Sequence, residues 1–268
     1  RSYLFVPGNR PDRFDKACAA GADTVIVDLE DAVPASDKRS AREALAAWVS
    51  PERPVLVRIN SADSEWFRDD LALCGLPGVA GVVLPKAERE QDLSTIAAAG
   101  APVILPLIES ALGMWNALGL ARAPRVERLV FGAIDFSFDL RIKEGDQELL
   151  YFRSQLVLVS RVAGIQAPVD GVTVDIDDLD RVREETGRAR ALGFGGKLCI
   201  HPKQVSAVNA GFAPTDAERD WATRVLEAAA NANGAAVALD GKMVDRPVIL
   251  IARQMLENAA RHEARGQP

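Results

Sequence analysis

Charged residues stand at the ends of several apolar runs in this 268-residue chain. The run Val103–Ile108 is aliphatic apart from Pro106 and is followed by Glu109, and a second run, "RLVFGAID", ends on Asp135. Short apolar runs of this kind are typical of strands that are buried on both faces. Two carboxylates at the ends of adjacent strands would lie about 5 Å apart at the backbone and would repel each other. A divalent cation would remove this repulsion, and Mg²⁺ suits a site in which two protein oxygens are completed by water and substrate.

Zinc fits these residues less well, because it requires imidazole or thiolate ligands. His201 is the imidazole near a predicted strand end, whereas His262 lies in the C-terminal tail. Pro202 follows His201 directly, so a structural role for His201 at a strand-to-helix turn is an open alternative. The sequence therefore favours an oxygen-only magnesium site.

The elements that would position these residues alternate regularly. Short β-branched runs are followed by segments of helical period that are rich in Ala, Leu, Arg and Glu, as in βα units. Strands are predicted at 2–7, 23–30, 55–60, 81–86, 102–109, 128–135, 167–175 and 196–202, and helices at 11–20, 36–48, 64–73, 90–98, 111–120, 147–163, 177–192 and 215–233. Eight of each within about 230 residues predict a (β/α)8 TIM barrel. A doubly wound sheet is the alternative, but it would require a glycine-rich phosphate loop, and "FVPGNRPDR" contains a single glycine.

In such a barrel the carboxyl ends of all strands open onto one face, where active sites are built. Helix capping is an alternative explanation for carboxylates at these positions. It does not explain Arg58, which cannot cap a helix N-terminus, and it explains Glu109 poorly because Glu109 continues an apolar strand. We therefore predict an active site on this rim, formed by Asp28, Glu30, Asp31, Arg58, Asn60, Lys86, Glu109, Asp135, Asp175 and His201.

The domain organisation follows from the barrel. Residues 1–233 are predicted to form the barrel, and residues 234–268 a C-terminal extension with a turn-rich stretch, "LDGKMVDRP", and a final helix. The net charge of −6 argues against a general nucleic-acid or anionic-membrane surface. No apolar run reaches the ~18 residues of a membrane span. The N-terminal residues do not form a signal peptide, and three scattered cysteines form no disulfide framework, so we expect a cytoplasmic protein.

Seven segments, in order, resemble the citrate lyase beta-subunit family within the metal-dependent acyl-CoA lyase and pyruvate-aldolase superfamily. They are "YLFVPGNRPDRF", "VIVDLEDAVP", "VLVRIN", "VVLPKAE", "LIES", "GAIDF" and "CIHPKQV". The resemblance also implies a (β/α)8 barrel. It further implies an Mg²⁺-dependent carbon–carbon lyase that cleaves, or condenses, a 3-hydroxyacyl thioester bearing a carboxylate, such as citryl-, malyl- or citramalyl-CoA. The products would be an acetyl thioester and a 2-oxo acid such as oxaloacetate.

The same resemblance implies roles for individual residues. Glu109 and Asp135 match the family's metal ligands, and Arg58 matches its substrate arginine. The guanidinium of Arg58 would bind a carboxylate or the thioester oxygen through two parallel hydrogen bonds and stabilise the enolate. Glu30 and Asp31 match residues that line the water shell of the metal.

Three further matches concern the thioester and the subunit interface. Lys38 and Arg42 match positions near the phosphates of the thioester, although a solvated helix face explains them equally well. Asp245 in "KMVDRP" matches an aspartate that, in related lyases, reaches into a neighbouring subunit's site as general acid. A turn aspartate before Arg246 is the alternative. The resemblance therefore implies a homo-oligomer, a trimer or hexamer, in which the extension acts as a lid.

The identity of the substrate stays open. Many relatives have Glu at the position of Ile134, which indicates a different acid substrate or subgroup. Two other functions are kept as alternatives. One is a subunit of a citrate lyase complex that acts on an acyl-carrier-protein thioester, and the other is a metal-dependent aldolase of free hydroxy-oxo acids.

Overall fold

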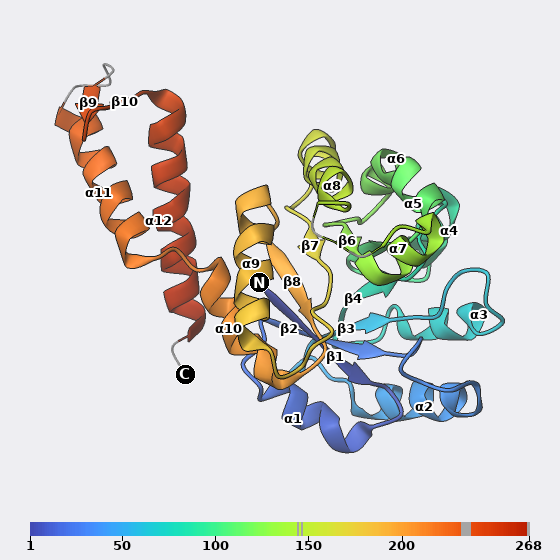
Figure 1. Cartoon of the computed structure of the whole chain (residues 1–268). Helices are drawn as coiled ribbons and strands as arrows, with labels where there is room; N and C mark the ends of the chain where they lie inside the picture. Colours follow the sequence, from blue (N-terminus) through green and yellow to red (C-terminus); the bar gives the residue numbers. More distant parts are fainter. Residues whose placement is uncertain (144, 146, 232–236, 267–268) are drawn as a thin grey trace. The chain divides into compact units, whose positions relative to one another are not determined.

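The computed structural model describes residues 1–143, 145, 147–231 and 237–266. They belong to two compact units, Arg1–Asn209 and Ala210–Pro268. In the first unit eight parallel strands close into a barrel in the order β1 to β8. Figure 1 shows these strands in the interior of the unit, with helices outside them. The predicted (β/α)8 fold is confirmed.

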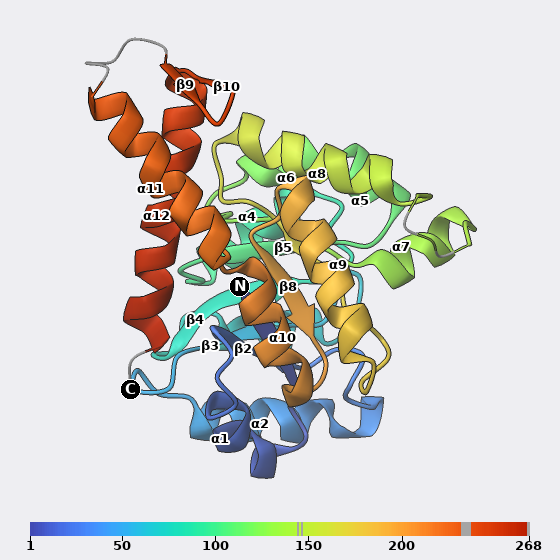
Figure 2. The ribbon, with the colours of Figure 1, turned by 60° about the vertical axis from the view of Figure 1, so that its left-hand side comes forward.

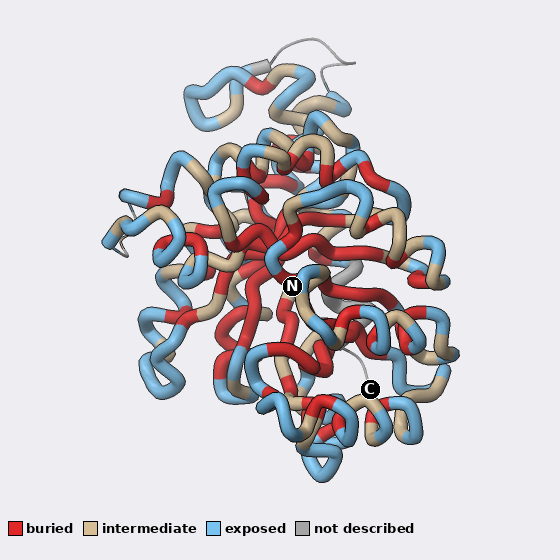
Figure 3. The backbone as a smooth tube through the Cα atoms, turned by 90° about the vertical axis from the view of Figure 1, so that its right-hand side faces the viewer, coloured by how far each residue is buried: buried red, intermediate tan, exposed pale blue. Residues whose placement is uncertain are grey.

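The barrel strands are short. They are β1 (Ser2–Pro7), β2 (Thr24–Asp28), β3 (Val55–Arg58), β4 (Val79–Leu84), β5 (Ile104–Ile108), β6 (Val130–Phe131), β7 (Val169–Asp170) and β8 (Gly196–Cys199). Almost every residue of these strands is buried, as expected for a parallel sheet covered on both faces (Figure 3).

Helices follow the strands around the outside of the barrel (Figure 2). They are α1 (Phe14–Cys18), α2 (Lys38–Trp48), α3 (Phe67–Asp70), α4 (Glu90–Ala98), α5 (Ala111–Trp115), α6 (Ala117–Arg122), α7 (Ala133–Leu140), α8 (Leu150–Ala163), α9 (Leu179–Leu192) and α10 (Pro202–Phe212). Three 3₁₀ turns lie at Pro11–Arg13, Ala35–Asp37 and Leu71–Leu73. Helix α10 crosses the boundary between the two units.

Alternation along the strands determines which side chains enter the barrel. Side chains two residues apart on a strand point to the same face. The barrel interior is filled by an apolar cluster to which β2 contributes Ile26, β3 Leu56 and β5 Leu107. Two residues further on, at the carboxyl ends of the same strands, stand Asp28, Arg58 and Glu109. The period of two thus places charged side chains directly above the apolar interior.

Several elements differ from the prediction. Strand β6 has two residues instead of eight, because Gly132 ends it and α7 begins at Ala133. Asp135 therefore lies in the first turn of a helix, and the prediction that it ends a strand is wrong. The helix predicted at 111–120 is divided at Asn116 into α5 and α6. Helix α10 was not predicted, and it begins at Pro202, the last residue of the strand predicted at 196–202.

The second unit is a small helical assembly. Helices α11 (Asp216–Asn231) and α12 (Arg246–Gly266) are joined through the antiparallel hairpin of β9 (Val237–Leu239) and β10 (Lys242–Val244). Asp240 and Gly241 form the hairpin turn, and both have positive φ angles, 50° and 74°. The core of this unit is formed by Ala222, Val225, Val244 and Ala252.

The unit that contains the barrel ends at Asn209, earlier in the chain than the predicted residue 233. Helix α11 corresponds to the helix predicted at 215–233 as the last barrel helix, but it lies in the second unit, because its buried face packs in one core with α12. The boundary predicted between residues 233 and 234 lies outside the described residues. Among the helices that the structure describes, none has the length and apolar character needed to cross a membrane.

Candidate active site

A cavity of about 400 Å³ opens at the carboxyl ends of the barrel strands. Its position agrees with the rim predicted from the sequence. The lining combines charged residues, which are Asp28, Asp31, Arg58, Glu109 and Asp135, with Phe5, Pro7, Ala32, Leu107, Phe131, Gly132, Ala133, Ile134, Val172, Leu198 and Ile200.

Asp28 and Arg58 form the most constrained charged pair in the cavity. They are direct partners in the register of β2 and β3. Nε and Nη2 of Arg58 each donate to a different carboxylate oxygen of Asp28, both at 2.7 Å. Asp28 also accepts backbone hydrogen bonds from Glu30 at 2.9 Å and Ala32 at 3.1 Å. Burial opposes the charge on the Arg58 guanidinium, but the hydrogen bonds to Asp28 and the negative charges of Asp28, Glu30 and Glu109 together outweigh burial and raise the pKa of Arg58.

The remaining guanidinium nitrogen of Arg58 faces two further carboxylates. Nη1 lies 3.1 Å from Glu30 Oε2 and 3.8 Å from Asp31 Oδ2. Glu30 Oε2 accepts no aligned hydrogen bond, so this contact is an ion pair only. Burial raises the pKa of Glu30, against the opposing effect of Arg58. Nε and Nη2 of Arg58, which together could donate two parallel hydrogen bonds to a substrate, are thus bound to Asp28. Nη1 is the guanidinium nitrogen that Asp28 does not bind.

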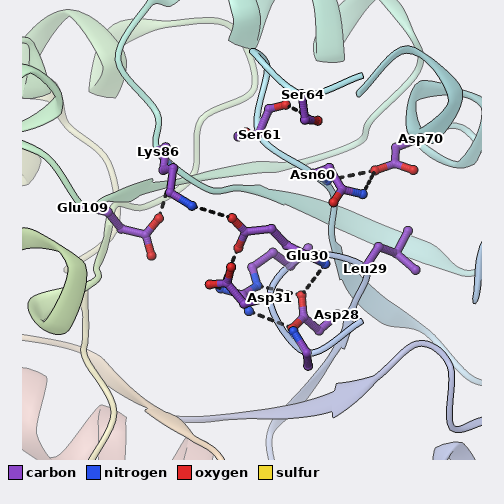
Figure 4. A network of polar contacts seen from close by, with 12 residues as sticks. Asp28, Leu29, Glu30, Asp31, Asn60, Ser61, Ser64, Asp70, Lys86 and Glu109 are labelled. Carbon is purple, nitrogen blue, oxygen red and sulfur yellow. Dashed lines mark hydrogen bonds and ion pairs between the residues drawn. The ribbon is translucent and has the colours of Figure 1, made fainter. Parts of the chain in front are cut away.

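Lys86 connects the ends of β4 and β5 (Figure 4). Its Nζ donates to Glu30 Oε1 at 2.8 Å, and its backbone N–H donates to Glu109 Oε2 at 3.0 Å. The φ angle of Lys86 is +48°, a left-handed conformation that costs a non-glycine residue about 1 kcal/mol or more. In this conformation the N–H of Lys86 meets Glu109 and its ammonium meets Glu30.

Glu109 is a buried carboxylate of the site, as are Asp28 and Glu30. It follows the fully buried strand β5 and is 5% exposed. Burial, and next the negative charge of Glu30, raise the pKa of Glu109 to about 8. The charge of Asp135 adds to this shift, and Arg58 opposes it. A cation beside Glu109 would remove this penalty on its charged form.

Asp135 lines the same cavity from the first turn of α7 and is exposed. Gly132 separates it from β6 and leaves room for Glu109. A Cβ atom on Gly132 would overlap Glu109 Cγ and lie 2.7 Å from Oε1. Glycine is therefore needed at residue 132 for the carboxylate of Glu109 to keep its place.

These residues fit Mg²⁺. Within the described part of the chain, no group of three or more His, Cys, Asp or Glu side chains is arranged to hold an ion. Glu109 and Asp135 offer two carboxylates to one cavity, one of them with an unfavourable buried charge. A hard cation that takes few protein oxygens and completes its shell with water and substrate matches this set.

We expect Gly132→Ala to weaken Mg²⁺ binding about 10- to 100-fold, the usual cost of displacing the support of a ligand. Titration calorimetry of the purified chain measures the affinity. Gly187→Ala on α9 is the matched control, because a Cβ there meets nothing within 4 Å. Equal affinities in the two variants would contradict the assignment of Glu109 as a ligand.

Lys38 and Arg42 do not have the free side chains expected of phosphate contacts. Lys38 is buried, and its Nζ donates to the carbonyls of Leu29 and Glu30, both at 2.7 Å, and to Asn60 Oδ1 at 2.6 Å. Three hydrogen bonds use all the donors of an ammonium group. The donors of Lys38 thus support the loop that carries Glu30, and its role near the thioester phosphates stays a prediction.

Arg42 is held in the same region. Its Nη1 and Nη2 lie 3.0 Å from Asp70 and Asp69, respectively. Asp70 in turn accepts from the backbone N–H and the side chain of Asn60, at 2.8 and 2.6 Å (Figure 4). Since Asn60 also binds Lys38, the two cations belong to one network of hydrogen bonds and ion pairs. The role expected for Arg42 stays a prediction.

Two other predicted rim residues have structural contacts. His201 Nδ1 accepts from the backbone N–H of Lys203 at 3.2 Å, at the start of α10. Asp175 accepts from the N–H groups of Asp177 and Asp178, both at 3.3 Å. Neither residue lines the cavity. This agrees with the structural alternatives that the sequence left open for both.

Asp245 lies in the second unit, between β10 and α12. It is half-buried, its Oδ1 accepts from the N–H of Val248 at 3.4 Å, and its carbonyl accepts from Ile249 at 3.0 Å. These contacts are those of a residue at the start of a helix.

Comparisons with known proteins agree on one family. The sequence profile of the HpcH/HpaI aldolase/citrate lyase family matches residues 1–202. The chain is 38% identical to the citrate lyase subunit beta-like protein of Deinococcus radiodurans, over 97% of each chain. It is 35% identical to a (3S)-malyl-CoA thioesterase of Cereibacter sphaeroides, over 97% of this chain and 94% of that protein. It also superposes on CitE from Mycobacterium tuberculosis in complex with magnesium, acetoacetate and coenzyme A, with a TM-score of 0.87, 35% identity and 97% coverage of both chains.

Proposed function

The chain belongs to the HpcH/HpaI aldolase/citrate lyase family, and from that premise we propose the following reaction and residue roles. The chain is a carbon–carbon lyase that depends on Mg²⁺ and acts on an acyl-CoA thioester. It cleaves, or condenses, a 3-hydroxy-carboxyacyl thioester to give an acetyl thioester and a 2-oxo acid. The observation that carries the residue assignment is the cavity shared by Glu109, Asp135 and Arg58.

Glu109 and Asp135 are proposed as the metal ligands, with Glu30 and Asp31 near the water shell. When bound, Mg²⁺ supplies positive charge that lowers the pKa of the substrate hydroxyl and neutralises the carboxylate of the oxo acid. The carboxylates of this chain hold that charge at the mouth of the barrel.

Arg58 is proposed to stabilise the enolate of the acetyl thioester. Breaking the carbon–carbon bond leaves negative charge on the thioester oxygen, and a fixed donor aimed at that oxygen lowers the barrier. Asp28 fixes the guanidinium through Nε and Nη2. The N–H groups of Nη1 are then the donors that hydrogen-bond to the thioester oxygen as it becomes negatively charged.

Asp245 is proposed as the general acid that protonates the enolate carbon, supplied by a neighbouring subunit of a trimer or hexamer. If Asp245→Ala chains are mixed with Glu109→Gln chains, we expect part of the activity to return, because one mixed site keeps both residues. Each variant alone is the control, and subunit exchange is followed by native mass spectrometry. Exchange without any recovery of activity would confine Asp245 to its own chain.

Two alternatives are kept. A relative from Leuconostoc mesenteroides, 36% identical, is named citrate lyase subunit beta, which favours a complex subunit that uses an acyl-carrier-protein thioester. An aldolase of free hydroxy-oxo acids is consistent with the name of the matching family. We further propose a cytoplasmic location, in agreement with the charge and cysteine content.

The deciding experiment assays the purified chain on citryl-, malyl- and citramalyl-CoA, with Mg²⁺ and with EDTA. We expect acetyl-CoA and a 2-oxo acid in equal amounts, with Mg²⁺ only. Release of free CoA without acetyl-CoA would indicate thioester hydrolysis instead. Cleavage of free aldols but of no thioester would contradict the proposal, and a requirement for the carrier protein would favour the complex subunit.

A further inference from the structure

Two acceptors compete for the N–H groups of Arg58 Nη1. One is the thioester oxygen of the proposed reaction, and the other is the carboxylate of Glu30, whose Oε2 lies 3.1 Å from Nη1. Glu30 is 6% exposed, and its Oε2 accepts a hydrogen bond from none of the described residues. A buried acceptor in this state costs about 1–3 kcal/mol. Some other contact therefore holds the Glu30 carboxylate out of alignment with Nη1.

Lys86 supplies that contact (Figure 4). Its Nζ donates to Glu30 Oε1 at 2.8 Å, and within the described part of the chain it is the one side chain with an aligned hydrogen bond to this carboxylate. The backbone of Lys86 is fixed as well. Its N–H donates to Glu109 at 3.0 Å, and the N–H of Ala87 donates to the carbonyl of Leu107 at 3.2 Å. The ammonium therefore reaches Glu30 from a fixed base beyond the end of β4.

The guanidinium of Arg58 is fixed from the other side. Asp28 binds Nε and Nη2, both at 2.7 Å, so the guanidinium plane cannot turn toward Glu30 without breaking these bonds. Asp31 Oδ2 lies further from Nη1, at 3.8 Å, and Asp31 is exposed to solvent. Glu30 is thus the buried competitor, and its alignment with Nη1 depends on where Lys86 holds its carboxylate.

We propose that Lys86 is a positioning residue for the lyase reaction. Its ammonium holds the Glu30 carboxylate out of line with the N–H groups of Arg58 Nη1, and so keeps these donors available to the thioester oxygen. Lys86 is not among the described residues that line the cavity, and it acts through Glu30 rather than on the substrate. The inference rests on the proposed function, in which Nη1 stabilises the enolate, and deepens it.

Removing the ammonium should turn Glu30 into an acceptor for Nη1. Among the described residues, Arg58 would then be the one cation in contact with this buried carboxylate. A charge-assisted hydrogen bond between them is roughly twice as strong as a neutral one. Nη1 would be occupied at the moment when the thioester oxygen becomes negatively charged. Loss of a donor to such an oxygen slows catalysis about 100- to 1,000-fold, and a second N–H on Nη1 should limit the loss to on the order of 10- to 100-fold.

Lys86→Met tests the role of the ammonium in the acetyl-CoA assay. Methionine keeps the backbone N–H that binds Glu109 and, like lysine, is unbranched at Cβ, so it suits the same left-handed backbone. We expect kcat to fall on the order of 10- to 100-fold, while KM and the affinity for Mg²⁺ stay close to wild type. Lys86→Arg restores a charged donor and should recover most of the loss.

Lys203→Met is the matched control, because Lys203 is also an exposed lysine paired with one carboxylate, Asp177 at 2.6 Å, and it does not line the cavity. It should leave kcat unchanged. Thermal unfolding of the variants checks that they are folded.

A double-mutant cycle with Glu30→Gln separates positioning from simple structural support. An uncharged amide is drawn to the guanidinium far less strongly, so Lys86→Met should have little further effect in the Glu30→Gln background. A structural role for Lys86 would give the same loss of kcat in both backgrounds. A crystal structure of Lys86→Met measures the displacement itself, and Glu30 Oε2 should accept an aligned hydrogen bond from Arg58 Nη1.

The outcomes distinguish this inference from the proposed function. Wild-type kcat in Lys86→Met, an equal loss in the two backgrounds, or a Glu30 carboxylate that has not moved in the crystal structure overturns the role of Lys86 and leaves the lyase function standing. Failure of the wild-type chain to cleave any thioester refutes the proposed function, and the role of Lys86 falls with it.

Discussion

Replacing Glu109 with glutamine is expected to abolish Mg²⁺ binding and to reduce thioester cleavage on the order of 1,000-fold or more. The amide keeps the shape of the side chain but removes the negative charge that a hard cation requires. The barrel should remain folded, since Glu109 stands beyond the apolar interior. Calorimetric titration with Mg²⁺ and the acetyl-CoA assay measure the two effects.

The same variant has a second effect, on the pH dependence of stability. Between the ordinary value of 4.5 and about 8, the folded metal-free protein keeps the proton of Glu109, whereas the unfolded chain releases it. The stability of the wild type must therefore fall as pH rises through this window. Relative to Glu109→Gln, its free energy of unfolding should fall by on the order of a few kcal/mol from about pH 5 to about pH 9 in EDTA.

Urea unfolding at several pH values measures this difference. Glu43→Gln is the matched control, because Glu43 is exposed on α2 and pairs only with Arg39 at the surface. It should change neither the pH dependence nor the affinity for Mg²⁺. Wild-type metal affinity in Glu109→Gln would refute the assignment of Glu109 as a ligand.

Arg58→Lys is expected to reduce kcat by on the order of 100-fold or more while the chain still binds Mg²⁺. A lysine presents one nitrogen, so it cannot hold both oxygens of Asp28 and at the same time offer a donor to the thioester. The buried carboxylate of Asp28 would lose part of its bidentate support. The loss should therefore affect the chemical step more than the binding of the oxo acid.

Steady-state kinetics of the cleavage reaction measures this split between kcat and KM. Arg89→Lys is the matched control, because Arg89 pairs with Asp63 at 2.6 Å and Asp92 at 2.8 Å at an exposed position outside the cavity. If Arg58→Lys and Arg89→Lys have the same kcat, the guanidinium group of Arg58 is not needed for the reaction.

The fold could be predicted from the sequence because the strands of a closed parallel barrel are buried on both faces. Runs such as Val103–Ile108 contain little besides aliphatic residues, and the segments between them have a helical period. The extent of β6 could not be predicted, because "RLVFGAID" has no residue that marks the start of a helix except Gly132, and α7 has no side-chain cap. Helix α10 was missed for a related reason, since "GKLCIHP" reads as a single strand.

The charged residues of the candidate site could be predicted from the sequence, but the contacts among them could not. The cavity brings Arg58, Glu109 and Asp135 together, although their roles stay proposals. The burial of Lys38 could not be predicted, because a lysine on a polar helix face usually reaches solvent. Gly132 was missed because its importance lies in the space beside Glu109, which only the fold reveals. The pairing of Asp28 with Arg58 was not predicted, because it depends on the register of β2 and β3, in which these two residues are direct partners.

That pairing has a consequence for how this protein could diversify. Asp28 and Arg58 are the terminal residues of β2 and β3, and the ladder between the two strands sets them side by side. The loops that follow can accept insertions or exchanges without moving the pair, since connecting segments tolerate such changes far better than sheet positions do. The loops at this end of the barrel could thus change, and with them the preferred acid, while Asp28 keeps the guanidinium of Arg58 in the same position.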